Sequence, residues 1–134
     1  MTPRSKSRVT ACTRDEARAR LNQARAFLDV AEIVLSEDAH EAHVAAALAV
    51  LAGIAASDAI CGQSLGQWSR GQDHSAAVEL LATVAVKDKT VPSKLKSLLS
   101  TKDEVHYSPR LITVARAKSM VREATALLAE AELR

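Results

Sequence analysis

The stretch 42-AHVAAALAVLAGIAA-56 decides the fold, because it is apolar on every side when it is wound into a helix. A helix with one apolar face packs at the surface of a domain, whereas one that is apolar all round must be covered on several sides. The run is shorter than the roughly 20 apolar residues that span a bilayer, and it contains His43 and Gly53. It therefore predicts the central helix of a domain that is not embedded in a membrane, beginning between Ala39 and Glu41.

An amphipathic helix is predicted ahead of this run. Thr13 followed by Glu16 is a capping-box pattern, in which each side chain satisfies a free backbone N–H at the helix start. We expect this helix to end near Ser36, with one apolar stripe at Ala17, Leu21, Ala24, Leu28, Ala31 and Leu35. Residues 1–12 are expected to form a flexible basic arm.

Glycines at 62, 66 and 71 predict one long connection over residues 62–72, followed by three more helices. The first begins at Asp73. The second has Pro92 in its first turn, where the missing N–H costs nothing, and continues through Lys102 and Val105. The last begins near Thr113. No segment shows the alternation typical of strands. The sequence thus predicts an all-α, four- to five-helix up-and-down bundle over residues 13–134.

Composition narrows the function classes. Phe27, Trp68 and Tyr107 are the only aromatic residues, which argues against a platform that stacks nucleic-acid bases. Cys12 and Cys61 form no C-x-x-C pair, so a reducing compartment is expected. No apolar segment follows the basic residues at the N-terminus, so no secretory signal is predicted. We expect a cytoplasmic protein.

Asp58 directly follows the most apolar run. Burying a carboxylate costs several kcal/mol unless it is paired or hydrogen-bonded. Either the helix is leaving the core and Asp58 points to water, or it faces a polar partner on another helix.

Two further polar groups lie at predicted helix ends. Asp73 is a good N-cap residue, and His74 would then lie in the first turn, where the helix dipole favours the neutral imidazole. In 101-TKDEVHYSPR-110, Lys102 and His106 would share one helix face. Tyr107 would close that helix, with its ring buried and its hydroxyl hydrogen-bonded.

His40 and His43 make an H-x-x-H pair, but a metal site needs further ligands, and none has suitable spacing. A surface turn is the expected explanation of the pair. No phosphate-binding glycine loop or nucleophile motif occurs either, so neither a metal nor a cofactor is predicted.

Three short motifs resemble the HEPN superfamily, most closely its small stand-alone bacterial members. They are Ala56-Ser57-Asp58-Ala59, Gly71-Gln72-Asp73-His74 and the segment from Lys102 to Tyr107. The resemblance covers roughly residues 14–133. It implies a bundle of four or five helices that is commonly dimeric. It also implies a role in RNA processing, in toxin–antitoxin systems or beside a nucleotidyltransferase partner.

The sequence departs from the ribonuclease members of that superfamily, which carry an Arg and a His separated by four to six residues. Here Arg70 and His74 are separated by three residues, and Lys102 and His106 likewise. We therefore expect a domain that acts by binding nucleic acid, a nucleotide or a nucleotidyltransferase-type partner. One alternative is a metal-independent ribonuclease toxin that uses His74 or His106 with Arg70 or Lys102. Another is a purely structural dimerisation bundle.

If the resemblance holds, the motif residues should converge on one site. The expected binding residues are Asp58, Arg70, Asp73, His74, Lys102 and Tyr107. Asp58 should pair there with Lys102 or His74, which would offset its desolvation. Wide Ala/Leu faces on the first and last helices further predict a two-fold homodimer.

Overall fold

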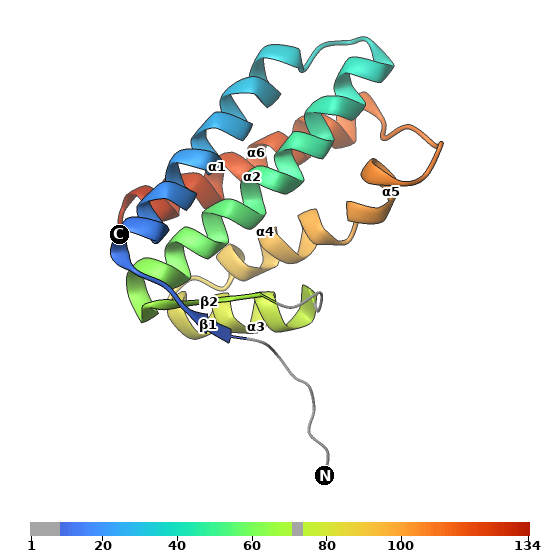
Figure 1. Ribbon diagram of the computed structural model, residues 1–134. Coiled ribbons are helices and arrows are strands. Elements are labelled where there is room, and N and C mark those ends of the chain that lie inside the picture. Colours follow the sequence, from blue (N-terminus) through green and yellow to red (C-terminus); the bar gives the residue numbers. More distant parts are fainter. Residues whose placement is uncertain (1–8, 71–73) are drawn as a thin grey trace.

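The computed structural model describes residues 9–70 and 74–134 and is mostly helical, as the sequence predicts (Figure 1). Within these ranges there are six helices and a small two-stranded sheet. In chain order they are β1 (Val9–Ala11), α1 (Arg14–Val34), α2 (Ala39–Leu65), β2 (Gln67–Ser69), α3 (His74–Val84), α4 (Thr90–Leu99), α5 (Lys102–His106) and α6 (Val114–Glu132).

α2 is the central helix, as the run at residues 42–56 predicts. Figure 1 shows α1 running antiparallel beside it, α6 behind it, and the shorter helices around its other sides. Its Ala side chains at 45, 46, 49, 55, 56 and 59 have no exposed surface. Small side chains let neighbouring helices approach closely, which explains how one helix packs against so many others.

The length of α2 corrects one expectation. At 27 residues, α2 is long and apolar enough to cross a membrane by length and composition alone, so shortness of the apolar run is no argument against a membrane span. However, 72% of its most apolar window is buried inside the protein, and the core helix of a soluble protein has the same property. It is the only helix of this kind in the described ranges.

The first helix begins as its sequence predicts. The N–H of Thr13 donates to Oε1 of Glu16 at 2.8 Å, and the N–H of Glu16 donates to Oγ1 of Thr13 at 3.0 Å. The helix ends at Val34, slightly before Ser36. The residues of its predicted stripe that lie within the helix are buried: Ala17, Leu21, Ala24, Leu28 and Ala31.

The predicted connection over residues 62–72 begins later than expected, because α2 continues to Leu65. Gly62 lies inside the helix, where a Cβ would stand 2.8 Å from Cβ of Ala17 and 2.9 Å from Sγ of Cys12. This glycine therefore permits the close approach of α1. Gly66 ends the helix with φ of 68°, a left-handed conformation that glycine adopts without strain.

The two strands were not expected from the sequence. Val9–Ala11 pairs antiparallel with Gln67–Ser69, with Thr10 opposite Trp68, and the N–H of Cys12 donates to the carbonyl oxygen of Gly66 at 2.9 Å. Residues 9–12 are thus part of the fold and not of a flexible arm. Strands of three residues are too short to show a periodic pattern in the sequence.

The fourth predicted helix is divided into α4 and α5. Pro92 lies in the first turn of α4 as expected, but the helix ends at Leu99. The hydroxyl of Ser100 donates to the carbonyl oxygen of Ser97 at 2.6 Å, and that of Thr101 donates to Leu98 at 3.0 Å. Hydroxyls bonded back to the preceding turn compete with the helix ladder. Lys102 therefore begins a separate short helix.

Candidate functional site

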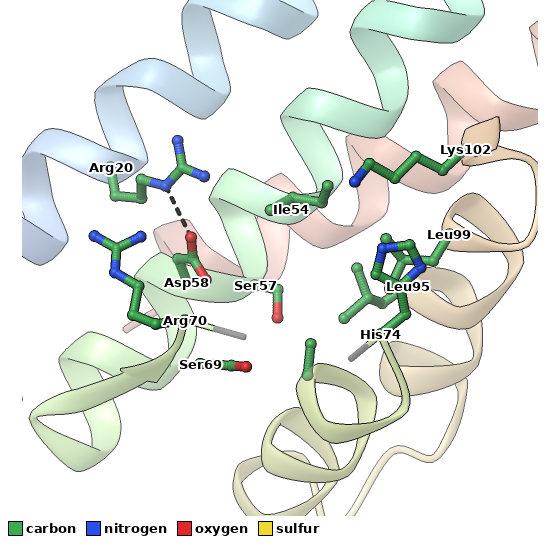
Figure 2. A pocket seen from close by; sticks show the side chains of 11 residues that line it. Arg20, Ile54, Ser57, Asp58, Ser69, Arg70, His74, Leu95, Leu99 and Lys102 are labelled. Atoms are coloured by element: carbon green, nitrogen blue, oxygen red, sulfur yellow. Dashed lines mark hydrogen bonds and ion pairs between the residues drawn. The ribbon is translucent and has the colours of Figure 1, made fainter. Parts of the chain in front are cut away.

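A pocket of about 190 Å³ lies near the C-terminal end of α2 and collects polar residues from several elements (Figure 2). Asp58 comes from α2, Arg70 directly follows β2, His74 begins α3 and Lys102 begins α5. The sequence places these four residues in one expected binding set, and the structure brings their side chains to a single pocket.

Two other members of that set lie elsewhere. The side chain of Tyr107 is 78% exposed and does not line the pocket, so its expected burial and convergence are wrong. The reason is the break at residues 100–101, which sets α5 apart from α4. Asp73 lies outside the described residues.

Asp58 is buried, and its partner is Arg20 of α1. Nε of Arg20 donates to Oδ2 of Asp58 at 2.9 Å, and the two side chains are 24% and 12% exposed. The expectation that Asp58 pairs with Lys102 or His74 is therefore wrong. Desolvation by burial raises the pKa of Asp58, and it outweighs Arg20 and Arg70, whose bond and charges lower it.

Arg20 is the pocket residue that was missed from the sequence. It follows Ala17 by three residues and precedes Ala24 by four, so it belongs to the buried stripe of α1. A guanidinium at such a position signals a buried carboxylate partner, which is what Asp58 provides.

Arg70 is held by the small sheet. Its guanidinium carbon lies 4.6 Å from the centre of the Trp68 ring, a cation–π contact. Trp68 is buried in β2, which β1 fixes at its edge. No carboxylate of the described residues lies within ion-pair distance of Arg70, although Asp58 is near enough for Arg70 to lower its pKa.

Lys102 and His74 lie on the opposite side of the pocket from Arg20 and Arg70 (Figure 2). In the described part of the chain, Lys102 has no carboxylate within ion-pair distance either. The pKa of nearby His106 is lowered, chiefly by burial and then by the charge of Lys102. His106 itself does not line the pocket.

His43 has a structural role at the other end of α2. Its Nε2 lies 2.9 Å from the carbonyl oxygen of Val105, and its Nδ1 accepts the N–H of Ile112 at 3.0 Å. This pair of bonds assigns the neutral Nε2–H tautomer. His43 thus joins α5 and the following loop to the central helix, and the expected surface turn is wrong for this residue. Within residues 9–70 and 74–134, no His, Cys, Asp or Glu cluster could hold a metal ion.

Comparison with protein-family models and with curated proteins found no match for this chain.

Proposed function

We propose that this protein is a HEPN-like domain that acts by binding, and that the pocket holds a phosphate group of a nucleic acid or nucleotide. Among the described residues, Arg20, Arg70 and Lys102 line the pocket together with one carboxylate, that of Asp58. Arg20 is matched by Asp58, so Arg70 and Lys102 supply the surplus positive charge. Guanidinium and ammonium groups donate charge-assisted hydrogen bonds to phosphate oxygens. The convergence of these two cations carries the proposal.

The size of the pocket also supports a phosphate group. The volume of about 190 Å³ is below the roughly 300–1,000 Å³ of most small-molecule pockets. The pocket would therefore hold the charged part of a larger ligand, such as RNA or a nucleotide offered by a nucleotidyltransferase-type partner.

The pocket favours contact with the phosphate over reading of the base. The ring of Trp68 is buried and lies beneath Arg70, so it offers no face on which a base could stack. Binding would then depend on charge and be independent of base sequence.

The test is the affinity for a labelled single-stranded RNA, measured by fluorescence anisotropy across a salt series with an unlabelled nucleotide as competitor. Arg70→Gln and Lys102→Gln should each weaken binding several-fold and lower the salt slope by about 1. Lys87→Gln and Arg122→Gln are matched controls, because both residues are exposed and lie outside the pocket. Equal losses in all four variants would refute a role for the pocket.

The geometry also gives one argument for the ribonuclease alternative, since His74 shares the pocket with Arg70 and Lys102. Metal-independent cleavage needs both a general base and a general acid. Only one imidazole lines the pocket in the described residues, because His106 lies outside it. We expect no RNA cleavage above that of a Lys102→Ala, His106→Ala double variant. Cleavage by the wild type that His74→Ala abolishes would establish the ribonuclease instead.

We propose a homodimer as the working form. Val30 and Ile33 expose apolar side chains on α1, and Ile33 is 79% exposed. Light scattering at micromolar concentration should give twice the monomer mass, and a monomer mass would refute it.

If the protein were only a structural dimerisation bundle, variants of the pocket would change no ligand affinity.

A further inference from the structure

A second pocket, of about 320 Å³, lies where α1 begins and α2 ends, and it shares no lining residue with the first. Three arginines line it: Arg14 and Arg18 from α1, and Arg134 from the chain end that follows α6. The end of the chain lies beside the start of α1 in Figure 1, and Arg134 bonds to Ser64 of α2 at 3.4 Å.

The charges of this pocket are poorly balanced by the protein itself. No carboxylate side chain of the described residues lines it. Arg134 pairs with Glu130 at 3.3 Å, whereas Arg14 and Arg18 form no ion pair with any described residue. Glu16 does not line the pocket and accepts the N–H of Thr13, although burial and then the nearby charge of Glu16 raise the pKa of the Cys12 thiol.

The positions of Arg14 and Arg18 are unfavourable for the helix alone. Arg14 is the first residue of α1, at the positive end of the helix dipole, where a cation is destabilising. Arg18 follows one turn later, and like charges at that spacing repel each other. A bound anion would relieve both repulsions and would also benefit from the helix start.

A buried polar atom accompanies the arginines. Gln63 also lines the pocket, and its Oε1 is buried without a hydrogen-bond partner in the part of the chain that the structure describes. An amide oxygen accepts hydrogen bonds, so it suits an anion that also carries a P–OH group, such as hydrogen phosphate or a singly protonated phosphate monoester.

We propose that this second pocket, named here the Arg14 pocket, binds a phosphate group through Arg14, Arg18 and Arg134. This proposal is independent of the function proposed above, because it concerns different residues in a separate pocket. It also places the half-buried thiol of Cys12, which lines the Arg14 pocket, directly beside the bound ligand.

Cys12 allows a local test of occupancy. Iodoacetamide alkylation should report on this thiol, since Cys61 is 2% exposed and burial raises the pKa of Cys61 to about 12. A bound phosphate would block access and disfavour the reactive thiolate. The alkylation rate should fall by about tenfold when the phosphate concentration is ten times its Kd, because only the free form reacts.

The rate is compared in inorganic phosphate and in chloride of equal ionic strength, and again with a 5′-phosphorylated oligonucleotide. Protection by inorganic phosphate identifies a free phosphate site, and protection by the oligonucleotide alone identifies a polymer end. Both support the proposal. If neither inorganic phosphate nor the oligonucleotide protects the thiol, the proposal is overturned. A Cys12→Ser variant confirms which thiol is labelled.

Matched double variants separate the two pockets. Arg14→Gln with Arg18→Gln should abolish protection, whereas Arg70→Gln with Lys102→Gln should leave it unchanged. Protection that survives in the Arg14/Arg18 variant would overturn the assignment. Circular dichroism should show that both variants fold, since all four side chains point into solvent or a pocket and glutamine is a good helix former. The RNA measurement described above decides the first pocket separately.

Discussion

The two ends of α2 hold polar side chains in different ways. Near its first turn, His43 has both ring nitrogens bonded to the backbone of Val105 and Ile112. Near its last turns, Asp58 is bonded to Arg20, while Arg70 and Lys102 face the same pocket with no carboxylate partner among the described residues.

The difference separates polar residues that hold the fold from those that remain available to a ligand. A half-buried imidazole with both nitrogens satisfied has no capacity left for an external group. A cation in a concave site without an internal partner retains its donors, and a ligand can use them. The first end of α2 is therefore structural, and the second combines one structural pair with two cations that have no carboxylate partner among the described residues.

The largest expected effect tests the structural pair. Arg20→Gln leaves the carboxylate of Asp58 buried without its charge partner, and we expect a loss of about 3 kcal/mol in the free energy of unfolding at neutral pH. Urea unfolding provides the measurement. Arg25→Gln is the matched control, because its Nε bonds Glu132 at 2.8 Å on the same helix, but the two side chains are 45% and 41% exposed. That exposed pair should contribute at most about 0.5 kcal/mol.

The stability loss caused by Arg20→Gln should also depend on pH. Burial already raises the pKa of Asp58 above its ordinary 3.8, and removal of Arg20 should raise it further. A carboxyl group with a raised pKa binds its proton more tightly in the folded state than in the unfolded state. Its charged form therefore destabilises the fold, and this effect is largest at pH values above the folded pKa. That effect disappears as the pH falls below the unfolded value. The loss caused by Arg20→Gln should shrink towards pH 4, and adding Asp58→Asn should recover most of it at neutral pH.

An intermediate effect is expected at the first end of α2. His43→Ala removes the partners of the Val105 carbonyl and the Ile112 N–H, and we expect a loss of about 2 kcal/mol. Hydrogen exchange should show α5 and residues 107–113 opening more readily. His40→Ala on the same helix is the control, and its exposed side chain should change stability by less than about 0.5 kcal/mol. Similar values for the two histidines would refute the structural role of His43.

The smallest expected effect concerns the available cations. Arg70→Gln and Lys102→Gln should each change the free energy of unfolding by at most about 1 kcal/mol, because neither leaves a described carboxylate without its ion-pair partner and the cation–π contact of Arg70 with Trp68 contributes on the order of 0.5–1 kcal/mol. Thermal unfolding is sufficient to measure this. A loss as large as that of Arg20→Gln would show that the two cations hold the fold, which would remove the contrast within the pocket.

Much of the helical framework follows from local patterns. The Thr13–Glu16 capping box, the stripe of α1, the start of α2 and the start of α6 near Thr113 all match the structure. These features depend on residues within one or two turns of each other, so the sequence reports them directly. The strand pair was missed because it depends on backbone hydrogen bonds between segments that are far apart in the sequence. The break after α4 was missed because it depends on two hydroxyls that bond to carbonyl oxygens of the preceding turn.

The candidate pocket was anticipated only in part. The grouping of Asp58, Arg70, His74 and Lys102 follows from the family-like motifs and from the antiparallel course of the chain. The predicted partner of Asp58 was wrong. Its partner Arg20 lies 38 residues away on another helix, and the position of Arg20 in the buried stripe of α1 was not recognised. The predicted placement of Tyr107 was wrong because it assumed that α4 and α5 form one continuous helix.

By itself, the sequence determined that this protein is all-α and that its centre is the apolar run at residues 42–56. The reason is that the apolar surface of a helix must be buried whatever the detailed packing. Only the tertiary structure decided which charges are paired and which remain available. Ion pairs and pockets join residues from separate helices, and their geometry depends on how closely those helices approach. Here the small residues of α2 set that approach, through its Ala faces and through Gly62 against Cys12 and Ala17.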